Sequence, residues 1–168
     1  MKYIATPHGP LVEGASPELL RELLEQYEEK LVALGAPVRE TMLPGIGRDE
    51  VESKLALRGL ACPDEIAVWF GWHNGYNRAG MRHPGIPLIF NASLDRSLKA
   101  YDDSTREFAL AWEKGINYAS LAYGATEGWL RLQGISDAIA VECVNPGAEP
   151  PRVIFANSEF TDPDAQHL

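Results

Sequence analysis

Residues 59–75 read GLACPDEIAVWFGWHNG and carry the clearest structural signal in the chain. The run Pro63-Asp64-Glu65 predicts the start of a helix, because proline suits the first helical position and acids complement the helix dipole. Asn74-Gly75 predicts its end, since glycine accepts the left-handed conformation of a helix C-cap. The inward stripe of this helix is expected to hold Ile66, Trp69, Phe70 and His73. We therefore expect a buried helix that Gly75 closes in a left-handed conformation.

Two more helices are predicted upstream of this stretch. Ser16-Pro17-Glu18 begins a helix with apolar residues at three- and four-residue spacing, and Gly35 ends it. A shorter helix begins near Asp49 and stops at Gly59. The charged residues off the apolar face of the first helix are interpreted as a solvated surface; they include Glu22, Glu25, Glu28, Glu29 and Lys30.

Downstream, the pattern changes from helices to strands. Ser93 caps a predicted helix that reaches Tyr101, and residues 105–114 form another. The β-like runs are residues 86–90, 129–132, 139–144 and 152–156, of which the last two form a hairpin. This order predicts an α+β fold in which N-terminal helices pack against a mainly antiparallel sheet.

The chain is expected to be one domain over residues 1–168, with an irregular arm at about residues 1–15 and a short tail at about residues 157–168. The inward positions of its elements are expected to share a single core. These positions are Leu19, Leu23, Tyr27, Ile66, Trp69, Phe70, Trp129 and Val141.

Composition narrows the classes of function. With 15 basic and 24 acidic residues the net charge is −9, which argues against direct binding to nucleic-acid phosphates. Apolar residues make up 45% of the chain, so a packed core is expected. No apolar run is long enough for a membrane helix, and the N-terminus has no long apolar segment typical of a secretory signal. We expect a cytoplasmic protein that does not contact a membrane.

The sequence offers no catalytic or metal-binding motif. None of the histidines shows metal-ligand spacing; they are His8, His73, His83 and His167. His73 lies on an apolar helix stripe and is interpreted as a hydrogen-bonded core histidine. Cys62 and Cys143 occur in unrelated contexts and are expected to be free thiols. Adjacent acids at Asp102-Asp103 are more typical of a solvated turn than of an acid–base pair. We expect no catalytic residue, no cofactor and no metal ion.

The 59–75 stretch resembles the signature of the SUKH superfamily, in which a proline precedes a helix of acids and aromatics and an Asn-Gly stop. The superfamily includes the yeast cell-wall-synthesis regulator and many bacterial toxin-immunity proteins. Residues 47–55 resemble the preceding helix of the family, 129–132 its tryptophan strand and 139–143 its acid-bearing strand. The matches span residues 45–156. The resemblance implies an α+β fold without catalytic residues and, for bacterial members, an immunity role in which the protein neutralises a cognate toxin.

Two acidic surfaces are candidates for binding a partner with a basic face. One surrounds Trp72 and is expected to include Asp64, Glu65, Asp102 and Asp103. The other is the acidic region 121–168, with Glu142, Glu149 and Glu159. Trp72 lies opposite the apolar stripe of its helix. We expect it to pack under a second layer, formed by the loop after Gly75; the alternative is that it stands exposed as an interface anchor.

The expected function is therefore that of a non-catalytic immunity protein that covers a toxin, for example a nuclease. A cytoplasmic regulatory or scaffold protein is the alternative. A small enzyme or ligand-binding protein is a third hypothesis, which a pocket with convergent polar groups would favour.

Overall fold

The computed structural model describes residues 2–6, 9–77, 92–113, 128–132, 137–144 and 151–157. The predicted strand at 86–90 lies outside these residues, as do His8, His83 and His167 and all but the first residue of the predicted tail.

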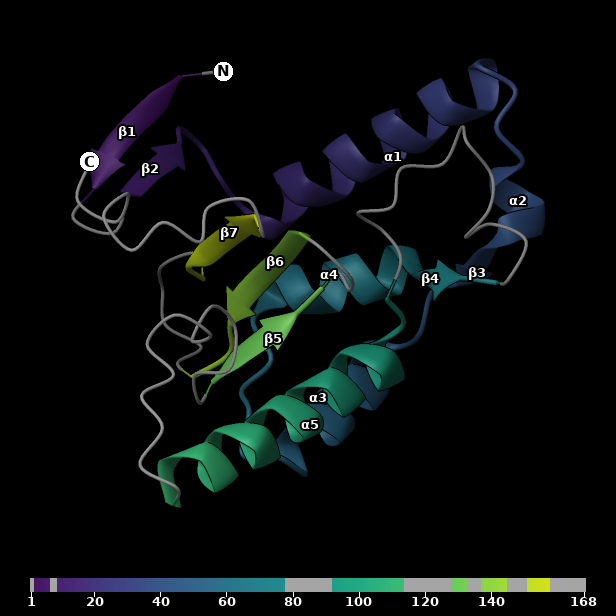
Figure 1. The fold of residues 1–168 in the computed structure, drawn as a ribbon. Helices are drawn as coiled ribbons and strands as arrows, with labels where there is room; N and C mark the ends of the chain where they lie inside the picture. Colours follow the sequence, from purple (N-terminus) through teal and green to yellow (C-terminus); the bar gives the residue numbers. More distant parts are fainter. Residues whose placement is uncertain are drawn as a thin grey trace.

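The helices are α1 (Pro17–Ala33), α2 (Val38–Thr41), α3 (Arg48–Ala56), α4 (Asp64–Trp72) and α5 (Leu94–Glu113). Figure 1 shows α4 between α1 on one side and the adjacent helices α3 and α5 on the other. The Ser16 hydroxyl caps α1 by accepting a hydrogen bond from the backbone N–H of Leu19, as the Ser-Pro-Glu start predicts. Residues 94–113 form one continuous helix, so the expected break between Tyr101 and residue 105 is wrong.

The strands are β1 (Tyr3–Thr6), β2 (Gly9–Val12), β3 (Met42–Pro44), β4 (His73–Tyr76), β5 (Trp129–Arg131), β6 (Asp137–Glu142) and β7 (Val153–Asn157). Every described pairing is antiparallel, which confirms an α+β fold. The described strands form three small sheets, β1–β2, β3–β4 and β5–β6–β7, and not the single sheet expected. The β6–β7 hairpin was predicted. The prediction of an irregular N-terminal arm was wrong, because β1 and β2 pair from Tyr3↔Val12 to Thr6↔Gly9.

The described core divides into two clusters, so the expectation of one shared core is wrong. The first cluster lies between α3, α4, α5 and the three-stranded sheet, and it contains Ile66, Phe70 and Val141. The second joins α1 to the β3–β4 sheet; it contains Leu31, Val38, Met42 and Tyr76, with Tyr27 packed against it. Trp69 contacts both clusters. Leu19 and Leu23 are half-buried, because the buried positions of α1 are Leu24 and Leu31. Trp129 is also half-buried, because the buried residue of β5 is Leu130.

Gly75 has φ = 78°, so its left-handed conformation was predicted correctly. Its role differs from the expectation, because α4 already ends at Trp72 and Gly75 lies within β4. A Cβ atom at Gly75 would lie 2.6 Å from the backbone nitrogen of Ser93. Glycine is therefore required where β4 passes the start of α5.

None of the helices that the structure describes is both long enough and apolar enough to span a lipid bilayer.

Candidate protein-binding surface

The two predicted acids at the start of α4, Asp64 and Glu65, have different surroundings. The exposed Asp64 carboxylate lies 2.6 Å from the Arg48 guanidinium, which also contacts Glu52 at 2.5 Å. Glu65 is half-buried. Arg48 therefore neutralises part of the negative charge that was expected to attract a partner.

The two predicted acids on α5, Asp102 and Asp103, are also paired with basic side chains. Arg58 binds Asp102 through two hydrogen bonds of 2.8 and 2.7 Å. Asp103 accepts from Lys99 at 2.5 Å and from Arg106 at 2.8 Å. The hydrogen bond from Arg58 lowers the pKa of Asp102, and that from Lys99 lowers the pKa of Asp103. Both carboxylates are thus held charged, but each has a cation beside it.

These acids do not form one rim. Asp64 pairs with Arg48, at the first residue of α3, whereas Asp102 pairs with Arg58, beyond the last residue of that helix. The nine residues of α3 alone span roughly 13 Å, so the two arginines lie near opposite ends of this helix. Asp64 and Asp102 therefore lie toward opposite ends of α3.

On the three-stranded sheet, Glu142 pairs with Arg152 through two hydrogen bonds. The Arg152 guanidinium also stacks over the ring of Trp129, 5.5 Å from its centroid. The other two acids predicted in this region, Glu149 and Glu159, lie outside the described residues.

Trp72 packs inward, as the second-layer interpretation predicts. Its indole N–H donates to Glu28 Oε2 on α1 at 2.9 Å, and its ring packs edge-on against Trp69 and His73. The covering layer that the structure describes is α1, whereas most of the loop after Gly75, which was expected to cover Trp72, lies outside the described residues. Trp72 therefore positions α1 and is not an exposed anchor.

The face of α1 that points away from α4 carries acids, most of which the sequence predicts as solvated surface. Glu28 was wrongly included in that prediction, because its carboxylate is half-buried against Trp72 and His73. The exposed glutamates of this face are Glu18, Glu22, Glu25 and Glu29. Their spacing of four, three and four residues puts them within an arc of about 60° over about 16 Å of helix. None of the four forms an ion pair with another described residue; Glu22 accepts a hydrogen bond from Gln26 at 3.0 Å. We call these four residues and Val32 the outer face of α1.

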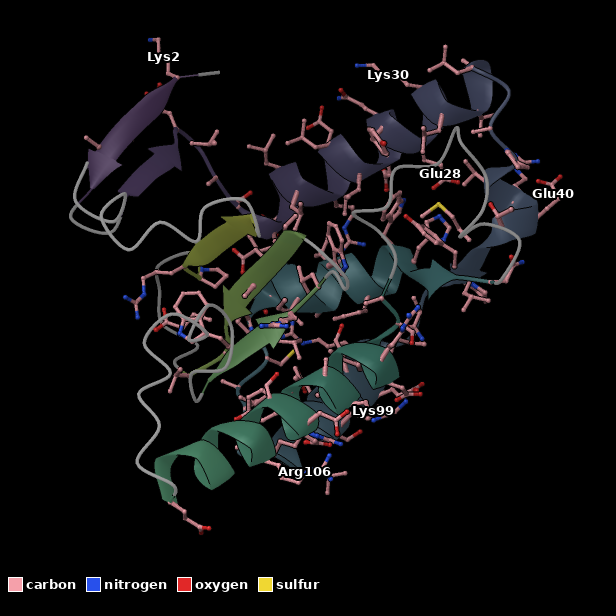
Figure 2. All side chains as sticks on the ribbon, viewed as in Figure 1. Lys2, Glu28, Lys30, Glu40, Lys99 and Arg106 are labelled. Atoms are coloured by element: carbon pink, nitrogen blue, oxygen red, sulfur yellow. The ribbon has the colours of Figure 1, made fainter. Side chains whose placement is uncertain are left out.

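Apolar side chains continue this surface at the C-terminal end of α1. Val32 lies three residues beyond Glu29 and is 46% exposed, and Leu34 at the C-cap is 84% exposed. Figure 2 shows Lys30 pointing away from the body of the protein and Glu28 on the side of α1 toward the body. The helix carries five acids and two bases, a net charge of 2 − 5 = −3.

A groove of about 300 Å³ adjoins the N-terminal end of this face. Glu18 and Arg21 line it from α1, and the Arg48–Asp64 pair lines it from the other helices. Ile46, Ala67 and Val68 contribute apolar lining. Glu18 belongs to both the groove and the outer face of α1, so the two features form one continuous surface.

The described histidine is fully engaged. His73 Nδ1 lies 3.0 Å from the carbonyl oxygen of Leu43, and Nε2 lies 3.2 Å from Glu28 Oε2. Its side chain is only 15% exposed. The interpretation of His73 as a hydrogen-bonded core histidine is confirmed. A general base needs a ring nitrogen that can reach a substrate, and here both nitrogens already face protein oxygens.

The two cysteines are free, as predicted, but their contexts are not unrelated. The backbone N–H of Ala61 donates to the carbonyl of Cys143 at 2.6 Å, and both thiols pack in the first core cluster. Burial raises the pKa of Cys62 to about 11 and that of Cys143 to about 12. Both therefore stay protonated at neutral pH, which does not suit a nucleophile. Among the described residues, no three His, Cys, Asp or Glu side chains gather as a metal site.

The chain matches no protein-family model, no curated protein and no solved structure in the three comparisons made with known proteins.

Proposed function

We propose that the chain is a non-catalytic protein-binding domain and that the outer face of α1 recognises a partner with a basic face. The observation that carries this proposal is the row of four exposed glutamates without ion pairs among the described residues. The predicted acids Asp64, Asp102, Asp103 and Glu142 already have cations of this chain beside them.

Unpaired charge matters because it retains its long-range field. A row of carboxylates steers a basic partner toward α1 and aligns it along the helix. Val32 and Leu34 add apolar surface at one end, and the groove beside Glu18 gives a side chain of the partner a place to be buried at the other. Steering, alignment and burial together suit a protein partner better than a small ligand.

The state of the reactive side chains within the described residues supports a role without catalysis. His73 has a protein oxygen on each ring nitrogen, and the pKa of each cysteine is raised well above neutrality. The carboxylates of Asp102 and Asp103 are held by cations, so they are poorly placed to exchange protons near neutral pH.

On the resemblance to the SUKH superfamily, we further propose that the partner is a toxin and that this protein is its cytoplasmic immunity protein. An acidic face of this kind would cover a basic, nucleic-acid-binding active site and exclude its substrate.

Affinity capture from the cells that make the protein tests the binding proposal. Three baits are compared: the wild type, a variant with all four outer glutamates changed to Gln, and a control variant. The control loses the same charge elsewhere, through Glu13→Gln, Glu40→Gln, Asp49→Asn and Glu113→Gln at exposed positions. We expect the wild type and the control to retain the same basic protein and the α1 variant to lose it. Equal capture by all three baits would contradict the proposal.

The toxin hypothesis needs its own test. The captured protein is expressed alone and together with this chain, and cell survival is measured. Arrest of growth by the captured protein, relieved by the wild-type chain and not by the α1 variant, is expected. A captured protein that is harmless when expressed alone would exclude the immunity role and leave the binding role standing.

A further inference from the structure

The four glutamates on the outer face of α1 form a straight row with regular spacing. Glu18, Glu22, Glu25 and Glu29 lie four, three and four residues apart, so they advance along the helix axis by about 6, 4.5 and 6 Å. All four are exposed, and none forms an ion pair within the described part of the chain. This spacing restricts the shape that a basic partner can have.

A second α-helix matches the row, whereas an extended strand does not. Basic residues spaced four, three and four along a helix advance by the same distances, and the series reads the same from both ends. A strand presents side chains on one face about every 6.6 Å, so its fourth side chain would lie about 3 Å beyond Glu29. The backbone groups in the interior of α1 are already paired within the helix, so a strand would find none to bind, whereas a partner helix satisfies its own.

The N-terminal end of the row indicates the direction of the partner helix. Arg21 and the Arg48–Asp64 pair line the groove beside Glu18. Arg21 is exposed and forms no ion pair with another described residue, although Glu18 lies one turn away. The last carbonyl groups of a helix carry partial negative charge and accept hydrogen bonds from arginine. The groove therefore suits the C-terminal end of a partner helix.

The C-terminal end of the row favours the same direction. The last carbonyl groups of α1 give this end a partial negative charge, which attracts the positive N-terminal end of another helix. Val32 and Leu34 are exposed apolar side chains at this end. An apolar residue in the first turn of an antiparallel helix would cover them.

We propose that the outer face of α1 binds an amphipathic basic α-helix of the partner, which lies antiparallel to α1. Lysine or arginine residues spaced four, three and four along that helix face the glutamates. Its first turn covers Val32 and Leu34, and its last turn enters the groove beside Arg21. The assignment specifies the shape of the partner's basic face and rests on the proposed function.

Three synthetic helical peptides of equal composition test this assignment. In the antiparallel peptide, a leucine lies three residues before four lysines spaced four, three and four; in the parallel peptide, it lies three residues after them. In the scattered peptide, the lysines are distributed around the helix. Alanine fills each peptide to about 20 residues, because shorter isolated helices are marginal in water. Each peptide ends in an amide, so that no free carboxylate can bind Arg21.

Fluorescence anisotropy of labelled peptides at low salt gives the dissociation constants. We expect the antiparallel peptide to bind at least about tenfold more tightly than the scattered peptide, because only the former brings all four lysines to the glutamates. This difference is the size of four exposed ion pairs that contribute about twofold each. The parallel peptide should bind with intermediate affinity, since its leucine lies at the groove and its last carbonyl groups lie far from Arg21.

An Arg21 variant has an effect whose sign is diagnostic. Loss of a cation from the protein would in general strengthen the binding of a cationic peptide. Because Arg21 is assigned to the last carbonyl groups of the partner helix, we expect Arg21→Gln to bind the antiparallel peptide about threefold more weakly. Lys30→Gln is the matched control, because Lys30 is another exposed cation of α1 and lies off the row. This variant should bind the peptide slightly more tightly.

Several results would overturn the assignment. Equal affinities for the antiparallel and scattered peptides would exclude a helix that matches the row, and so would the absence of binding at about 1 mM peptide. Tighter binding of the parallel peptide, or an unchanged or higher affinity of Arg21→Gln, would exclude the antiparallel direction.

These results are distinguishable from failure of the proposed function. If the capture experiment requires the outer glutamates but the peptides bind equally, the binding role stands and the partner presents its basic face in another form. If the peptides bind as expected but capture does not depend on the outer glutamates, the helix-binding property of α1 stands and the proposed function is contradicted.

Discussion

The side-chain oxygen of Asn74 accepts a hydrogen bond from the backbone N–H of Leu94 at 2.7 Å. Leu94 is the first residue of α5, whose N-terminal amides lack partners within the helix. Asn74 therefore satisfies one of these backbone N–H groups from another part of the chain. The Ser93 hydroxyl satisfies a second, because it accepts a hydrogen bond from the backbone N–H of Arg96 at 3.3 Å. The end of the 59–75 stretch joins α4 to α5 in this way.

Replacing Asn74 should weaken this junction. Asn74→Ala leaves the Leu94 N–H without its acceptor and is expected to lower the free energy of unfolding by about 1 kcal/mol, as for the loss of a helix cap. Asn74→Asp retains an acceptor at the same place and should be nearly neutral. Chemical denaturation of the three proteins measures the difference. Identical stability of the Ala variant and the wild type would show that the cap is dispensable.

Gly75→Ala should lower the free energy of unfolding more than an alanine substitution at another left-handed glycine. Gly35 has φ = 81° and open space around it, whereas a Cβ at Gly75 meets the Ser93 nitrogen at 2.6 Å and the Ala92 carbonyl carbon at 2.9 Å. Alanine at Gly35 is expected to cost about 1 kcal/mol from left-handed strain alone. The clash at Gly75 should add at least about 1 kcal/mol. The two alanine variants are compared by denaturant titration, and equal losses would mean that no close approach exists.

The first core cluster should tolerate truncation poorly. Phe70 is completely buried, and Phe70→Ala is expected to lower the free energy of unfolding by about 3–5 kcal/mol. Leu57 is 82% exposed, and Leu57→Ala should change it by less than about 0.5 kcal/mol. Thermal and urea denaturation give both values. A small effect at Phe70 would place this side chain outside the cooperative core.

The cysteines should resist thiol reagents in the folded protein. The pKa of Cys62 is raised to about 11 by burial and that of Cys143 to about 12, so little thiolate exists at neutral pH. Compared with an ordinary thiol, labelling near pH 8 should be slower by about a hundredfold or more. Addition of denaturant should restore the ordinary rate, and rapid labelling of the native protein would refute the burial of these thiols.

The raised pKa values of the two cysteines should make the folded protein less stable at alkaline pH. Folding favours the neutral thiols, so their contribution to stability is fully present below the ordinary thiol pKa near 8.5 and is lost as the pH rises toward 11 and 12. A Cys62→Ala/Cys143→Ala double variant should lose less stability between about pH 8.5 and 11 than the wild type. Parallel curves for the two proteins would contradict this origin of the loss of stability at alkaline pH.

Local signals in the sequence predicted most helices correctly. Ser16-Pro17, Pro63-Asp64-Glu65 and the late strand runs each act within a few residues, and the elements they predict are present. The break in α5 was misplaced because Asp102-Asp103 looks like a turn in isolation. In the structure Arg58, 44 residues upstream, holds Asp102 on the surface of a continuous helix.

The contacts that define the candidate surface depend on distant residues. Glu28 and His73 are 45 residues apart, and Glu28 also accepts the indole N–H of Trp72, which lies 44 residues from it. Likewise, the ion pair Lys54–Asp95 joins α3 to α5, and Arg58–Asp102 joins the segment after α3 to α5. The sequence therefore could not tell which acids would be neutralised. The spacing of Glu18, Glu22, Glu25 and Glu29 was visible as one helical face. That face gained its significance once the structure showed that the predicted acids Asp64, Asp102, Asp103 and Glu142 are paired with cations.

The central claim is that unpaired charge on the outer face of α1 brings a basic partner to the protein. The most direct measurement is the association rate constant of the captured partner over a series of salt concentrations. It is made with the wild type, the variant with the four outer glutamates changed to Gln, and the control variant with equal charge loss elsewhere. The wild type and the control should associate more slowly as salt rises, because salt screens exposed charges over about 8–10 Å. The α1 variant should associate about tenfold more slowly at low salt and respond little to salt. Equal rates and equal salt dependence for all three proteins would contradict the account.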